Sequence, residues 1–137
     1  MDRPIEVLLV EDNPADVELT RKALADGKIR NTVHVARDGF AAIEFLRDKG
    51  TPRPDLILLD LTLPGMDGLE VLAKLKQDSA LRSIPVIVLS SSGSDADVED
   101  AYRLHASCFI RKPVNYAQFS DVVRTLEGFW FQVVRLP

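Results

Sequence analysis

Short apolar runs and longer amphipathic stretches alternate along the chain, and each kind occurs five times. Residues 56–59 and 86–89 are apolar at every position, a pattern typical of strands that are buried on both faces of a parallel sheet. The runs that we interpret as strands are Ile5–Val10, Thr32–Ala36, Asp55–Asp60, Pro85–Ser90 and Ser107–Arg111.

The stretches that follow these runs carry the signals of helix ends. Asn13 and Pro14 form a helix cap followed by proline at the first helical position, and Gly27 and Gly50 mark the ends of the first two helices. We expect the five helices to open at Asn13, Asp38, Asp67, Asp95 and Asn115. Strict alternation of strands and helices with short connections favours a doubly wound α/β fold, with residues 1–137 in one domain.

Composition narrows the class of protein. The length of 137 residues is close to the modal size of a domain, and 46% of the residues are hydrophobic, which is enough for one core. The net charge of −4 disfavours a nucleic-acid surface, and no apolar run approaches the roughly 18 residues of a membrane helix. The lone cysteine, Cys108, fits a reducing compartment. We therefore expect a cytoplasmic protein that binds neither nucleic acid nor membrane.

Polar side chains with reactive groups follow four of the five predicted strands. Ligands of an open parallel sheet bind outside the carboxyl ends of its strands, where such side chains can meet. Three carboxylates, one hydroxyl and one ammonium group should therefore converge at one edge of the sheet. They belong to Glu11 and Asp12 after the first strand, Asp60 at the end of the third, Ser90 at the end of the fourth and Lys112 after the fifth.

The predicted cluster of carboxylates requires positive charge nearby. At an effective dielectric constant near 20, two carboxylates about 5 Å apart repel by ~3 kcal/mol. Oxygen ligands select a hard cation, and few protein ligands with several retained waters suit Mg²⁺, or Mn²⁺ in its place, better than a caged Ca²⁺. Lys112 and Ser90 could bind the oxygens of a phosphoryl group, so the site is suited to placing such a group on a carboxylate.

Four segments at the strand ends resemble the receiver domain of two-component response regulators, the CheY-like family. This resemblance covers essentially the whole chain. It implies a flavodoxin-like three-layer sandwich, in which a five-stranded parallel sheet of order 2-1-3-4-5 is covered by five helices. The four segments are Val7-Leu8-Leu9-Val10-Glu11-Asp12-Asn13, Asp60-Leu61-Thr62-Leu63-Pro64-Gly65-Met66-Asp67-Gly68, Pro85-Val86-Ile87-Val88-Leu89-Ser90 and Phe109-Ile110-Arg111-Lys112-Pro113.

The resemblance also implies a role for each acidic residue. Asp60 would accept a phosphoryl group from a phosphohistidine of a sensor histidine kinase. Asp12, Asp60 and the backbone carbonyl of Thr62 would bind Mg²⁺ directly. Glu11 stands where the family often has Asp, and its longer side chain would act through a metal-bound water. Such a protein is not an enzyme in the usual sense, because it catalyses only its own phosphorylation and slow dephosphorylation.

The remaining implied roles belong to the phosphoryl-binding and switch residues. Lys112 would bind the phosphoryl group and precede a cis peptide bond to Pro113. Ser90 would be the hydroxyl switch residue, and Phe109 the aromatic switch residue. The family often has Tyr at the position of Phe109, so the movement of Phe109 would depend on packing alone.

A finer resemblance, to the small single-domain regulators paired with bacterial phytochromes, rests on Glu11–Asp16, on the long third loop and mainly on the end of the chain. A helix from Asn115 to Val134 would span about 30 Å, whereas strands span about 17–20 Å. Part of an extended tail at 127–137 should therefore project. Phe129, Trp130 and Phe131 would then form a homodimer interface, although they could instead fold back onto the domain or bind the kinase.

Other functions stay open at the level of sequence. The chain after Pro113 is barely long enough for the last helix, so we expect no output domain. The signal would then be carried by protein–protein interaction or by relay of the phosphoryl group to another carrier. One alternative is a degenerate receiver that acts only as an interaction module. Another is a small hydrolase or phosphatase, for which the sequence shows neither a nucleophile elbow nor a second catalytic acid.

Overall fold

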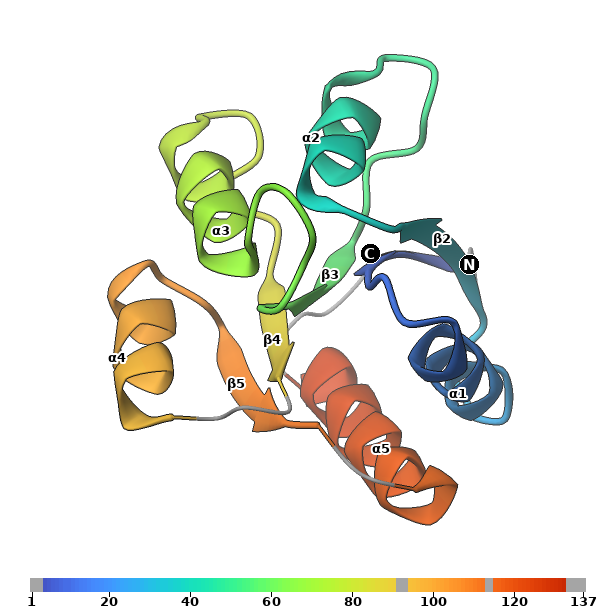
Figure 1. The fold of residues 1–137 in the computed structure, drawn as a ribbon. Coiled ribbons are helices and arrows are strands. Elements are labelled where there is room, and N and C mark those ends of the chain that lie inside the picture. Colours follow the sequence, from blue (N-terminus) through green and yellow to red (C-terminus); the bar gives the residue numbers. More distant parts are fainter. Residues whose placement is uncertain (1–3, 91–93, 113–114, 133–137) are drawn as a thin grey trace.

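The computed structural model describes residues 4–90, 94–112 and 115–132, and for residues 95, 108, 126 and 129–132 it describes the backbone alone. Strands and helices alternate strictly, as the pattern of apolar runs predicted (Figure 1). The elements are β1 (Ile5–Val10), α1 (Pro14–Ala25), β2 (Asn31–Ala36), α2 (Gly39–Arg47), β3 (Leu56–Asp60), α3 (Gly68–Gln77), β4 (Val86–Ser90), α4 (Asp95–Arg103), β5 (Cys108–Arg111) and α5 (Tyr116–Gln132).

The five strands form one parallel sheet in the order β2-β1-β3-β4-β5, which confirms the predicted topology. Predicted and observed strand boundaries differ by at most one residue. Pro85, for example, lies just outside β4, but its carbonyl still accepts the Ile57 N–H at 3.0 Å. The carboxyl ends of β1, β3, β4 and β5 therefore lie along one edge of the sheet.

Helices cover both faces of the sheet (Figure 1). Alternate residues of β1 and β3 point to opposite faces: Leu8 and Ile57 belong to the cluster with α2, α3 and α4, whereas Leu9 and Leu58 belong to the cluster with α1 and α5. This arrangement explains why the central strands are apolar at every position. Among the described residues, no helix is long and apolar enough to span a membrane.

Side-chain caps begin the helices at or next to the predicted positions. The side-chain oxygens of Asn13, Asp38 and Asp67 accept N–H groups of the first turns of α1, α2 and α3. The fourth helix begins at Asp95, as predicted, and the side chain of the preceding Ser94 caps it by accepting the Asp97 N–H at 3.2 Å.

The last helix begins as predicted. The side chain of Asn115 accepts the Gln118 N–H at 2.9 Å, and α5 then runs for 17 residues. Residues 133–137, and with them the expected end of this helix at Val134, lie outside the described residues. The side chains of 129–131 lie outside them too, so the projecting aromatic tail stays a prediction.

Candidate functional site

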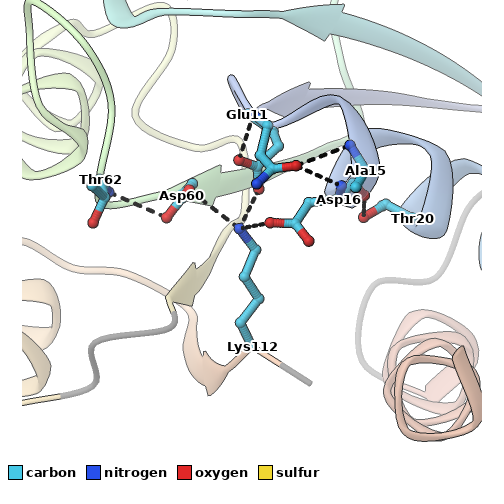
Figure 2. A network of polar contacts seen from close by, with 8 residues as sticks. Glu11, Ala15, Asp16, Thr20, Asp60, Thr62 and Lys112 are labelled. Atoms are coloured by element: carbon cyan, nitrogen blue, oxygen red, sulfur yellow. Dashed lines mark hydrogen bonds and ion pairs between the residues drawn. The ribbon is translucent and has the colours of Figure 1, made fainter. Parts of the chain in front are cut away.

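Several of the predicted site residues lie together at the carboxyl edge of the sheet, and Figure 2 shows Glu11, Asp60, Thr62 and Lys112 among them. Strand register places Asp60 beside Leu89, and Ser90 beside Arg111, so the ends of β3, β4 and β5 stand in one row. The row continues one residue further, because the Lys112 N–H donates to the Ser90 carbonyl at 2.9 Å. The sequence pattern predicted this convergence from the parallel sheet alone.

Glu11, Asp12 and Asp60 offer carboxylate oxygens that all lie within 4.8 Å of one another. Glu11 and Asp60 are buried, whereas Asp12 is exposed. A set made only of oxygen donors, open to solvent on one side, fits a hard divalent cation that keeps some of its waters. These three residues could therefore hold Mg²⁺ or Mn²⁺.

Lys112 supplies positive charge to the same carboxylates. Its Nζ atom lies 2.5 Å from Oε1 of Glu11, 2.7 Å from Oδ2 of Asp16 and 3.3 Å from Oδ2 of Asp60, as the dashed lines of Figure 2 show. The lysine side chain is only 10% exposed. The positive charge of Lys112 thus offsets part of the repulsion between these carboxylates.

On the pKa of each of these two groups, burial and the contact between Glu11 and Lys112 act in opposite directions. Burial, together with the nearby charge of Asp60, outweighs the contact with Lys112 and raises the pKa of Glu11 from 4.5 to about 7. Burial by itself would lower the pKa of Lys112, but hydrogen bonds to Asp16 and Glu11 outweigh it and raise that pKa. The ammonium group is therefore charged at any physiological pH.

The backbone around Asp60 is held closely. The Thr62 N–H donates to Oδ1 of Asp60 at 3.2 Å, which places the backbone of Thr62 beside the acid. Gly68 begins α3, and a Cβ atom there would lie 2.4 Å from the Asp60 carbonyl oxygen. A Cβ atom on Gly39 of α2 would lie 2.6 Å from the Met66 carbonyl oxygen. Two glycines thus allow α2 and α3 to close on the β3–α3 loop from both sides.

The two predicted switch residues lie on β4 and β5. Ser90 is fully buried at the end of β4. Phe109 is half-buried and packs against the cluster beneath α2, α3 and α4. Its N–H points away from β4 and donates to the Tyr102 hydroxyl of α4 at 3.2 Å. The bond between Lys112 and Pro113, predicted to be cis, lies outside the described residues.

Two site neighbours were not found from the sequence. Asp16 contacts Lys112, but an acid in the first turn of a helix is common for reasons of helix dipole alone. Tyr102 follows the apolar spacing of α4 and gives no separate signal. A clue to Asp16 is its position in the first turn of α1, the helix that follows Glu11 and starts at the same edge of the sheet.

Comparison with known proteins agrees with this geometry. Residues 7–124 match the response regulator receiver domain. Response regulator Rcp1 of Synechocystis sp. is 44% identical over 138 residues, which cover 98% of this chain and 94% of that protein.

Two solved structures are similarly close. The phosphorylated cyanobacterial phytochrome response regulator RcpA is 43% identical, with a TM-score of 0.88 over 95% of this chain and 96% of that one. The Mn²⁺-bound form of response regulator Rcp1 is also 43% identical, with a TM-score of 0.87 over 98% and 99%. Both the receiver resemblance and the flavodoxin-like fold are thereby confirmed, and this chain belongs to the response regulator receiver domain family.

Proposed function

We propose that Asp60 is the phosphoacceptor of this receiver and that a sensor histidine kinase is its phosphoryl donor. The observation that carries the proposal is the contact of Lys112 with Asp60, 3.3 Å long, inside a group of three carboxylates able to bind a cation. Family membership supports the same role. A degenerate receiver has no need of this arrangement.

The chemistry is a transfer between a nitrogen and an oxygen. A carboxylate oxygen of Asp60 attacks the phosphorus atom of a phosphohistidine, the O–P bond forms as the N–P bond breaks, and the imidazole nitrogen keeps the electron pair. Hydrolysis reverses the state: water attacks phosphorus, the O–P bond breaks, and Asp60 regains its carboxylate while phosphate leaves. The chain thus catalyses only its own phosphorylation and dephosphorylation.

The other site residues bind and orient the transferred group. Lys112 donates to a phosphoryl oxygen as a point charge. Asp12, Asp60 and the Thr62 carbonyl would hold Mg²⁺ or Mn²⁺, with Glu11 acting through a water. When bound, the cation supplies positive charge that offsets the charge on the phosphoryl oxygens. The Mn²⁺-bound structure of Rcp1 supports this assignment.

The switch residues Ser90 and Phe109 would then change position in response to the phosphoryl group on Asp60. The Ser90 hydroxyl donates to a phosphoryl oxygen and moves toward Asp60. Phe109 turns into the space that is left, and the face formed by α4, β5 and α5 changes shape. This is a shift between two packings, biased by new charge-assisted hydrogen bonds.

The relatives support a proposal about the kinase that donates the phosphoryl group. The likeness to RcpA supports a kinase of the phytochrome type as the donor. We further propose that residues 1–137 act as one receiver domain in the cytoplasm, and that α5 and the tail, with Phe129, Trp130 and Phe131, form a homodimer interface. The output is then phosphorylation-dependent binding to another protein.

Phosphoryl labelling tests the central assignment. Acetyl phosphate and Mg²⁺ should add one phosphoryl mass to the wild-type protein, seen by intact mass spectrometry and mapped to Asp60. Asp60→Asn should take up none, and Lys112→Ala should impair the labelling. Asp38→Asn is the matched control, because Asp38 also follows a strand and asparagine preserves its cap on α2. Labelling of the Asp60→Asn variant, or labelling mapped to Ser90, would contradict the mechanism.

A further inference from the structure

Asp16 holds the same lysine as the phosphoacceptor but lies outside the cation-binding group. Its Oδ2 atom is 2.7 Å from Nζ of Lys112, closer than the 3.3 Å that separates Nζ from Asp60. Figure 2 shows Lys112 reaching between the two carboxylates, with Asp16 coming from α1 and Asp60 from β3. Its oxygens are not part of the group formed by Glu11, Asp12 and Asp60.

The backbone of Asp16 is fixed by its own helix. Its N–H donates to the Asn13 side chain at 3.2 Å, and its carbonyl accepts the hydroxyl of the buried Thr20 at 2.8 Å. The acid therefore cannot follow Lys112 far if the ammonium group moves. The Asp16 side chain is 29% exposed, so much of its charge is felt by the lysine rather than by solvent.

Asp16 would compete with a phosphoryl group on Asp60 for the N–H donors of Lys112. An ammonium group has three N–H donors, and Glu11, Asp16 and Asp60 each offer Lys112 one carboxylate acceptor. A phosphoryl group on Asp60 brings further anionic oxygens that need a donor. The lysine must then turn from Asp16 or be shared between Asp16 and the phosphoryl group, and either change weakens an existing contact.

We infer that Asp16 is a positioning residue that draws Lys112 away from the phosphoryl group on Asp60 and so shortens the lifetime of the phosphorylated state. This inference rests on the proposed function, since it assigns regulation to the same site. The carboxylate favours the unphosphorylated receiver, because its contact with Lys112 is strongest there. If Asp16 served only to stabilise the first turn of α1, its removal would not change the lifetime of the phosphorylated state.

Binding of a phosphoryl mimic provides the test. With saturating Mg²⁺, determined separately for each variant, beryllofluoride should bind Asp16→Asn on the order of tenfold more tightly than wild type, as measured by calorimetry. The half-life of the Asp60 phosphoryl group should lengthen in parallel. Asp16→Glu, which keeps the charge, should return both values toward wild type. Glu18→Gln is the matched control: it removes one exposed charge from α1 and should change neither value.

The outcomes separate the two proposals. If the wild-type protein binds no beryllofluoride and takes up no phosphoryl group, the proposed function is wrong and the inference falls with it. If the wild type binds normally but Asp16→Asn binds no more tightly than Glu18→Gln, only the inference is overturned. Unfolding of metal-free Asp16→Asn, Lys112→Gln and the double variant adds a check without ligand, since additive effects on stability would exclude the contact.

Discussion

The carboxyl group of Glu11 is held where its ionisation is unfavourable. Burial, aided by the charge of Asp60, raises its pKa to about 7, whereas in the unfolded chain it has the ordinary value near 4.5. The folded state therefore binds the proton more tightly than the unfolded state does. The stabilising contribution is complete below pH 4.5 and is lost as the pH rises to about 7.

The first prediction follows from this difference. In metal-free protein, replacing Glu11 by Gln should remove a loss of stability on the order of a few kcal/mol between pH 5 and pH 8. Urea unfolding of both proteins at the two pH values measures it. Identical pH dependence in wild type and Glu11→Gln would contradict the raised pKa.

Asp12 provides a second prediction at the same scale. It is the exposed member of the group of carboxylates that could hold a cation, so its removal would take away a proposed ligand without opening the core. Asp12→Ala should lose Mg²⁺-dependent labelling by acetyl phosphate, yet its metal-free unfolding should show no loss of stability, because one repelling carboxylate has gone. Glu18→Ala, on the exposed face of α1, should label normally. Full labelling of Asp12→Ala at ordinary Mg²⁺ would refute the assignment.

At the scale of elements, α4 and β5 are joined by the hydrogen bond from the Phe109 N–H to the Tyr102 hydroxyl, which hydrogen exchange can test. β5 is an edge strand, and the Phe109 N–H faces outward to the Tyr102 hydroxyl. Tyr102→Phe keeps the ring but removes this acceptor. The Phe109 amide should then exchange its hydrogen faster by NMR, while the Ser107 amide, bonded to the Val86 carbonyl at 2.9 Å, should be unchanged. Equal rates for the Phe109 amide in both proteins would show that the contact does not form in solution.

The fold could be predicted at the level of elements because its signals are local and repeated. Apolar runs marked the strands, and polar residues with capping side chains marked the helix starts, including Asp95 at the start of α4. The site was predictable because residues at the ends of parallel strands must meet at one edge. Asp16 was not, since its contact with Lys112 depends on where a helix lies, and its residue type at that position has a simpler explanation.

At the scale of the whole molecule, we predict that two copies of the chain associate into a homodimer. The backbone of α5 continues to Gln132 and carries three aromatic residues near its end. Burying one aromatic side chain contributes about 1.5–3 kcal/mol, which is enough for three together to support a dimer. We expect light scattering at tens of micromolar to show a homodimer that tightens or rearranges with beryllofluoride.

Truncation supplies the control for this prediction. A chain ending at Glu127 keeps Val123 in the core beside α1 but lacks Phe129, Trp130 and Phe131, so it should be monomeric. A strict monomer with and without the mimic would rule out the dimer. A dimer that survives the truncation would place the interface elsewhere, and association of the aromatic segment only with a histidine kinase would favour the alternative role.

The close approach of α2 and α3 at Gly39 and Gly68 affects where a structural change at Asp60 can spread. The segment after Asp60 is held by close backbone approach near its two ends, where Gly68 lies against Asp60 and Gly39 lies against Met66. Ser90 and Phe109 are held by side-chain packing on the other flank. If Asp60 is the phosphoacceptor, as proposed, we expect the structural change on phosphorylation to extend mainly toward β4 and β5. A Cβ atom at position 39 or 68 would clash with this backbone, so Gly39→Ala or Gly68→Ala should displace α2 or α3 and alter that response.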